Sequence, residues 1–175
     1  QLTYRELDRA SDDVAAALVR RGVGPGDRVA FLGRESERYW ATLLAAAKLG
    51  AVLVPVNWRL SGDEVAHILS DSRAAAVFAD PGQALPAGLD AEVIGLDDPS
   101  WAQAVPPGAA APPVAEVSAD TPIAQLYTSG TTGLPKGVVL AHRSFFAVLR
   151  SLADHGLDWI EVRPDDVCLV GIPGF

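Results

Sequence analysis

The residues best suited to chemistry lie together in one loop, Tyr127–Val138, which reads Tyr-Thr-Ser-Gly-Thr-Thr-Gly-Leu-Pro-Lys-Gly-Val. Its glycines let the backbone turn sharply and approach a ligand closely, and successive N–H groups in such a loop can bind an anion. Lys136 adds a compact positive charge, and Pro135 stiffens the backbone before it. Four hydroxyls can donate to phosphate oxygens, those of Thr128, Ser129, Thr131 and Thr132. The loop therefore predicts a polyphosphate site.

This loop differs from a Walker A loop, which has the pattern G-x-x-x-x-G-K-[ST] followed directly by a helix. Here Lys136 is preceded by Pro135 and followed by Gly137, and a strand is expected next. A P-loop kinase or GTPase is therefore disfavoured. The simplest alternative is a flexible Gly/Thr surface loop with a solvated lysine. Twelve ordered positions argue against it, because the specificity of a motif grows with its length.

Helices and buried strands are expected to hold the loop in place. Thr3 with Glu6, and Ser61 with Glu64, each form the sequence pattern of a capping box at a helix start. A further helix is expected from about residue 36 to 50, with Trp40, Leu43, Leu44 and Ala47 facing inward. Between the helices lie short apolar runs that read as buried strands, at 28–32, 51–56, 74–79 and 91–96.

Alternation of helices with continuous apolar runs predicts an α/β fold with three layers, α/β/α, around a largely parallel sheet. We expect a first α/β part over 1–104, a Pro/Ala-rich connection over 105–120, and a phosphate-loop part over 121–175. In the last part we expect two strands, a helix and a further strand, at 122–128, 138–140, 144–152 and 167–172. The chain has no initiator Met and stops just after this last strand, so we expect it to be a piece of a longer protein.

Residues 127–138 resemble the signature phosphate-binding loop of the adenylate-forming, or AMP-binding, superfamily, whose members include acyl-CoA synthetases, luciferases and the adenylation domains of peptide synthetases. The resemblance covers essentially the whole chain and includes the segments 2–7, 26–30, 46–57 and 171–175. His142 falls where the family often has a histidine. Gln125 stands where an aliphatic residue is commoner, and this departure is not expected to affect phosphate chemistry.

The resemblance implies a two-step reaction, in which ATP activates a carboxylic acid as an acyl-adenylate and the thiol of coenzyme A then takes the acyl group. It assigns Lys136 as a supporting charge, and His142 either as a substrate contact or as a structural histidine at a helix start. It assigns phosphate contacts to Thr128, Ser129, Gly130, Thr131, Thr132 and Gly133. The ligand of Mg²⁺ and the other family residues of catalysis would lie beyond Phe175, so we expect these residues to be inactive alone.

Residues 56–60 resemble the corresponding segment of fatty acyl-CoA synthetases, which favours a fatty acid as the substrate. The alternatives are an amino-acid or aryl-acid adenylating domain, a phosphotransferase or ATPase with an unusual loop, and a non-catalytic nucleotide-binding homologue. A phosphotransferase would release ADP, whereas adenylation releases AMP and pyrophosphate.

Composition and charge indicate which classes of partner and which cell compartment to expect. The net charge is -8, and residues 81–120 hold six acidic and no basic residues. No basic stripe is present, so nucleic acid is not expected as a partner. We see neither a secretory signal nor an apolar run long enough to cross a membrane. A single cysteine, Cys168, excludes an internal disulfide. These features predict a cytoplasmic protein, with peripheral membrane association left open.

Overall fold

The computed structural model describes residues 2–128 and 133–157. Six strands form one sheet, namely β1 (Arg28–Leu32), β2 (Val52–Val56), β3 (Ala74–Ala79), β4 (Glu92–Gly95), β5 (Pro122–Thr128) and β6 (Lys136–Ala141). The helices are α1 (Tyr4–Arg20), α2 (Glu37–Leu49), α3 (Gly62–Ser72), α4 (Asp98–Ala104) and α5 (His142–Asp154). The expected strand over 167–172 and Cys168 lie outside the described residues.

The sheet has the order β4-β3-β1-β2-β5-β6. All neighbours pair in parallel except β5 and β6, which form an antiparallel hairpin around the loop. This confirms the expected α/β fold with a largely parallel sheet. Strand β6 is twice the expected length, because it begins at Lys136 and follows β5 along its whole length.

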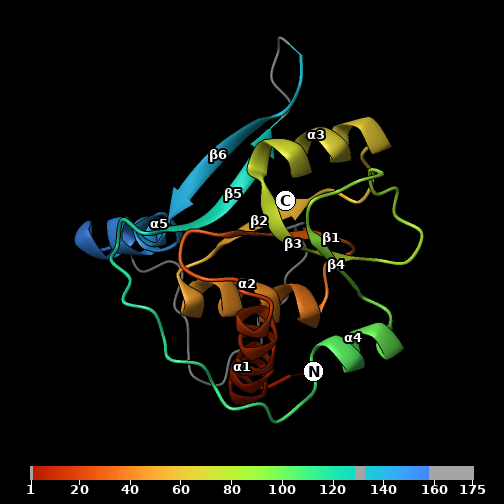
Figure 1. The fold of residues 1–175 in the computed structure, drawn as a ribbon. Coiled ribbons are helices and arrows are strands. Elements are labelled where there is room, and N and C mark those ends of the chain that lie inside the picture. The colour runs from red at the N-terminus through yellow and green to blue at the C-terminus, as the bar shows by residue number, and fades with distance from the viewer. Residues whose placement is uncertain (1, 129–132, 158–175) are drawn as a thin grey trace.

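Helices cover both faces of the sheet, as the three-layer prediction requires (Figure 1). On one face α1 and α2 pack over a core that contains Phe31 and Phe78. On the other face α3 buries Val65, Ile68 and Leu69 against the sheet. Short apolar strands buried on both sides are typical of a parallel sheet between helices.

Both predicted capping boxes are present. The backbone N–H of Thr3 donates to Glu6 Oε2 at 2.8 Å, and that of Ser61 donates to Glu64 Oε2 at 2.9 Å. Helix α2 ends at Gly50, whose φ of 66° lies in the left-handed region that glycine adopts readily. These caps fix where α1, α2 and α3 begin or end.

The predicted inward face of α2 was partly wrong. Leu43 is buried, and Trp40 and Ala47 pack against the core as expected, but Leu44 is 37% exposed. The helix lies between α1 and the sheet, so it buries a broader side than one stripe. That side includes Tyr39, which meets the ring of Phe31 edge to face with centroids 5.3 Å apart.

Helix α4 was not expected from the sequence. Its seven residues show no clear helical period, and it is held by Trp101, whose ring lies 5.5 Å from that of Phe78. The connection that follows runs without helix or strand, as predicted, and is tied to the helical layer. Ala109 N–H donates to Asp13 Oδ1 at 2.9 Å, and Ala115 N–H donates to the carbonyl of Lys48 at 2.7 Å.

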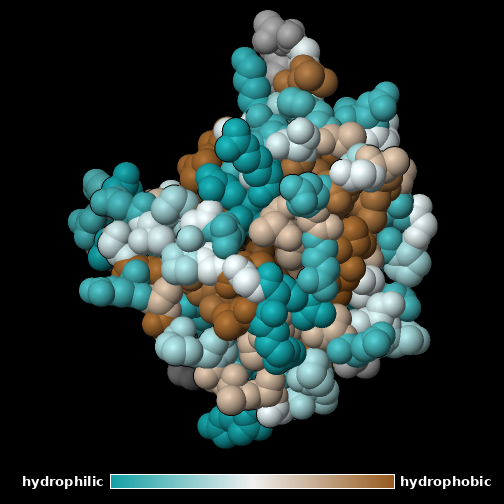
Figure 2. Space-filling model, in the orientation of Figure 1, coloured by the Kyte–Doolittle hydropathy of each residue, from teal (hydrophilic) through white to brown (hydrophobic). Residues whose placement is uncertain are grey.

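Helix α5 differs from the other long helices because it buries no residue. Its exposed apolar side chains are Phe145, Phe146, Val148 and Leu149. The space-filling view shows hydrophobic surface in this region, near α5 and the neighbouring end of α2 (Figure 2). Within the described residues, no helix is long and apolar enough to cross a membrane.

Candidate functional site

The predicted phosphate loop lies at the carboxyl edge of the sheet. β5 runs parallel to β2 and ends at Thr128, and the chain returns at Lys136 to start β6 (Figure 1). In open α/β sheets, ligands bind in the crevice outside the carboxyl ends of the strands. The fold thus places the Gly/Thr loop where such proteins bind nucleotides and similar ligands.

Thr128 and Lys136 stand opposite each other at the base of the loop, as partners in the antiparallel ladder. Directly opposed residues in such a ladder have Cα atoms about 4.5–5.5 Å apart. Both side chains are exposed, and among the described residues Lys136 forms no ion pair. A hydroxyl and an unpaired ammonium group therefore share one end of the hairpin and are free to meet an anion.

Gly133 is the other predicted phosphate contact that the structure describes. Its φ is 130°, a backbone conformation that residues with a side chain rarely adopt. Four predicted contacts lie outside the described residues, namely Ser129, Gly130, Thr131 and Thr132.

The chain on either side of the loop touches helix α3. These two segments, the end of β5 on one side and Pro135 with the start of β6 on the other, are here called the two stems of the loop. Tyr127 Oη donates to Asp71 Oδ2 at 2.5 Å, and His67 Nε2 lies 2.9 Å from the carbonyl oxygen of Pro135. Burial, and then the neighbouring Asp71 carboxylate, raise the pKa of the Tyr127 phenol well above its ordinary value. The phenol therefore remains a hydrogen-bond donor at neutral pH.

Gly137 makes room for the tyrosine. A Cβ atom at this position would lie 2.5 Å from Gln125 Nε2 and 3.1 Å from Tyr127 Cζ. The side chains of Gln125 and Tyr127 thus cross directly over the backbone of β6, where Gly137 pairs with Tyr127. Gly137 therefore makes this packing possible. The sequence indicated a role for the glycines of the loop in sharp turning and close approach to a ligand, and gave no sign of this packing role.

A cavity of about 270 Å³ adjoins both stems. It is lined by Pro55, Asn57, Leu60, Glu64, Ile68, Tyr127 and Pro135. Near the same edge Trp58 lies within 4.8 Å of the guanidinium groups of both Arg34 and Arg59, measured to its ring centroid. The segment 56–60, expected to bear on substrate choice, therefore adjoins the cavity beside the loop.

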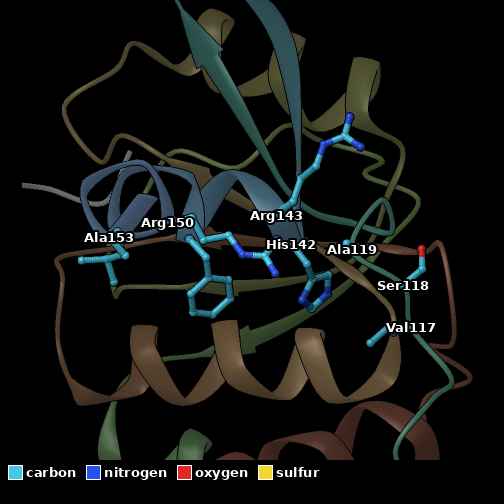
Figure 3. A pocket seen from close by; sticks show the side chains of 9 residues that line it. Val117, Ser118, Ala119, His142, Arg143, Arg150 and Ala153 are labelled. Atoms are coloured by element: carbon cyan, nitrogen blue, oxygen red, sulfur yellow. The ribbon is translucent and has the colours of Figure 1, made fainter. Parts of the chain in front are cut away.

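His142 lies at the opposite end of β6 from Lys136, as the first residue of α5. His142 is six positions after Lys136 along extended chain, which corresponds to about 20 Å at the rise of an antiparallel strand. His142 lines a second cavity, of about 550 Å³, between α5 and residues 117–119. Its Nε2 atom is buried and has no hydrogen-bond partner among residues 2–128 and 133–157. Figure 3 shows the side chain of Arg150 extending toward the imidazole, while Arg143 points away.

A family model described as AMP-binding enzyme matches residues 1–175. The chain belongs to the AMP-binding enzyme family. This confirms the family that the loop and the flanking segments indicated.

Two AMP-binding relatives illustrate how far the likeness extends. The fatty acid–[acyl-carrier-protein] ligase ScoC of Streptomyces coeruleorubidus is 51% identical over 99% of this chain and 34% of its own length. The long-chain-fatty-acid–CoA ligase FadD13 of Mycobacterium tuberculosis is 38% identical over 100% of this chain and 36% of its own length. The chain therefore spans about a third of the length of these relatives.

The fold is also similar to that of solved AMP-binding enzymes. A crystal structure of ATP-bound MatB from Rhodopseudomonas palustris matches 87% of this chain and 32% of its own, with a TM-score of 0.77 and 33% identity. Among the residues that this structure describes, no group of three His, Cys, Asp or Glu side chains could hold a metal ion.

Proposed function

We propose that this chain is the nucleotide-binding part of a longer ligase that activates a fatty acid with ATP and transfers the acyl group to a thiol. The observation that carries the proposal is the pairing of Thr128 and Lys136 at the base of a Gly/Thr loop on the carboxyl edge. This arrangement offers hydroxyls, backbone N–H groups and the exposed ammonium group of Lys136 to a polyphosphate.

In the first step a carboxylate oxygen of the fatty acid attacks the α-phosphorus of ATP. The bond from that phosphorus to the bridging oxygen of the β-phosphate breaks, and pyrophosphate leaves. The role of the loop is to hold the β- and γ-phosphates in line and to offset the charge that builds on the leaving group. Lys136 contributes its ammonium group, and no protein side chain forms a bond.

In the second step a thiolate sulfur attacks the acyl carbon and AMP leaves. Coenzyme A is the acceptor expected from the sequence, and the 38% identical relative is named a CoA ligase. The 51% identical relative is named an acyl-carrier-protein ligase, so a carrier protein is the second candidate acceptor. Both names support a fatty acid as the substrate.

The rest of the ligase is proposed to lie in chain beyond residue 175, including the Mg²⁺ ligand. Two observations support this. The relatives are about three times longer than the chain, and α5 exposes an apolar face that a further part of the same protein would cover. The cytoplasmic location stays a prediction.

His142 is proposed to contact the substrate away from the phosphates, because β6 separates it from the loop. Its buried, unpaired Nε2 atom and the apolar cavity around it support a contact with the fatty acid. His142→Ala should then raise KM for the fatty acid and leave KM for ATP unchanged. An equal rise in both constants would contradict this role.

The test is carboxylate-dependent exchange of pyrophosphate into ATP, measured with the longest natural version of the chain on fatty, aryl and amino acids. We expect exchange with fatty acids, and a loss of about a hundredfold in Lys136→Ala or Thr131→Ala, since one well-placed donor in a charge-stabilising site is worth that much. Release of ADP instead of exchange would overturn the proposal in favour of a phosphotransferase. Thioester formation with coenzyme A or with a carrier protein then identifies the acceptor.

A further inference from the structure

Two polar side chains of α3 meet the two stems of the loop. Asp71 accepts from the hydroxyl of Tyr127, the residue just before Thr128, at 2.5 Å. His67 Nε2 lies 2.9 Å from the carbonyl oxygen of Pro135, the residue just before Lys136. Since Thr128 and Lys136 face each other across the ladder, these contacts lie next to the two residues that form the base of the loop.

His67 and Asp71 are four residues apart, so they lie one above the other on the same side of α3. The opposite side of this helix is fixed, because Val65, Ile68 and Leu69 are buried in the core. Ser61 and Glu64 cap its start. The two contacts therefore connect the loop to a part of the fold that cannot shift without breaking the core.

On the β5 side the contact belongs to a chain of hydrogen bonds that all run in one direction. Arg28 Nε lies 3.5 Å from Gln125 Oε1, Gln125 Nε2 donates to Tyr127 Oη at 2.8 Å, and Tyr127 donates to Asp71. Such chains polarise and strengthen their members. Gln125, which the sequence suggested was irrelevant to the phosphates, is thus a partner of the residue that precedes the loop.

We propose that His67 and Asp71 are positioning residues, which set the separation and orientation of the loop's two stems and thereby its fit to the phosphates of ATP. The imidazole of His67 donates its Nε2–H to the Pro135 carbonyl, because a carbonyl oxygen can only accept, and the Asp71 carboxylate fixes Tyr127. This rests on the proposed function, because the loop must bind phosphates for its geometry to matter in catalysis.

Tyr127→Phe removes the hydroxyl and with it the hydrogen bonds to Asp71 and from Gln125, and His67→Leu removes the contact with Pro135. Each variant keeps an apolar side chain of similar size. His67→Gln keeps an N–H donor and tests for rescue. His155→Leu is the matched control, because among the described residues the imidazole of His155, which caps the end of α5, bonds to the carbonyl of Ser151 and not to the loop. Each is made in the longest natural version of the chain, and KM and kcat for ATP are measured well below the melting temperature.

We expect KM for ATP to rise about tenfold in Tyr127→Phe and in His67→Leu, as for the loss of one hydrogen bond that orients a binding loop. His67→Gln should recover most of the loss, and His155→Leu should change nothing. Amide hydrogen exchange over residues 126–128 and 136–138 should quicken in the first two variants only, with the rest of the sheet unaffected.

The proposal would be overturned if Tyr127→Phe and His67→Leu lowered the melting temperature but left amide exchange at both stems unchanged. The contacts would then serve stability alone. Exchange that quickens locally while KM for ATP is unaltered would overturn it as well. Failure of the proposed function looks different. The unsubstituted protein would then lack ATP–pyrophosphate exchange, while the effect of the variants on amide exchange at the stems would persist.

Discussion

At the scale of single residues, the loop depends on a glycine outside its turn. Gly137 faces Gln125 and Tyr127 so closely that an added methyl group would lie 2.5 Å from Gln125 Nε2. Gly137→Ala should cost about 1–3 kcal/mol of unfolding free energy, the usual range for an overpacked site. Chemical denaturation measures it, and Gly24→Ala is the control, because its added Cβ would meet no atom within 4 Å. Equal stability of both variants would show that Gln125 moves aside without cost.

Ionisation of Tyr127 gives a second test at this scale. Burial and the Asp71 carboxylate raise its pKa above the ordinary value of about 10. The folded state therefore holds this proton more tightly than the unfolded state does. The stabilisation is fully present below about pH 10 and is lost as the pH rises through the folded pKa. The stability difference between the unsubstituted protein and Tyr127→Phe should be constant from about pH 7 to 10 and shrink above. A difference that already shrinks near neutrality would contradict the hydrogen bond.

The composition of the loop could be predicted from sequence, but its supports could not. Glycines, hydroxyls and one lysine within twelve positions are a local signal. The contacts of His67 and Asp71 join segments that are 68 and 56 residues apart, and a spacing of four on a helix does not say what the side chains meet. Likewise His142 follows Lys136 closely in sequence, yet an extended strand carries it to the far end of the hairpin.

At the scale of elements, α1 and α2 are joined by a partly exposed cluster of charge. Lys48 Nζ lies 2.6 Å from Asp12 Oδ1 and 2.7 Å from Asp8 Oδ1, and its side chain is 19% exposed. Burial alone would lower the pKa of Lys48, but the hydrogen bonds to Asp12 and Asp8 outweigh it and raise the pKa. The cluster therefore favours the charged lysine and fixes the end of α2 against α1.

Lys48→Met should lower the unfolding free energy by about 1–3 kcal/mol, because it leaves two carboxylates facing each other without a partner. Thermal or urea unfolding measures the loss. Arg5→Met, at an exposed position of α1, is the control and should be nearly neutral. Comparable losses in both variants would mean that charge in general, and not this cluster, stabilises the helical layer.

Element prediction succeeded where burial produces a plain pattern. Strands β1, β3 and β5 were predicted with their observed bounds, since buried runs end at polar or helix-starting residues. The seven-residue α4 is too short for a helical period and is held by the contact of Trp101 with Phe78, which a local pattern does not reveal. The inward side of α2 was misassigned because helix and sheet cover it from two directions.

At the scale of the whole molecule, α5 is the element that the described fold leaves least supported. It buries no residue, and Phe146 and Leu149 are 58% and 51% exposed beside the cavity that they line. An apolar helix face of this kind is more often an interface than free surface. If the chain is the first part of a longer ligase, the following part should cover this face and stabilise the helix.

Amide exchange tests this directly. In the 175-residue chain alone, α5 should exchange at least about tenfold faster than α2, because few buried contacts oppose its local opening. In the longer protein, exchange of α5 should slow by a similar factor while that of α2 stays the same. Helix α2, already buried between α1 and the sheet, is the internal control.

If α5 exchanges equally in both proteins, the apolar face has no partner in the longer chain, and the proposed division into a nucleotide-binding part and a covering part would be wrong. Measurable acyl-thioester formation by the 175 residues alone would also contradict the proposed division, because these residues would then catalyse the reaction without a further part.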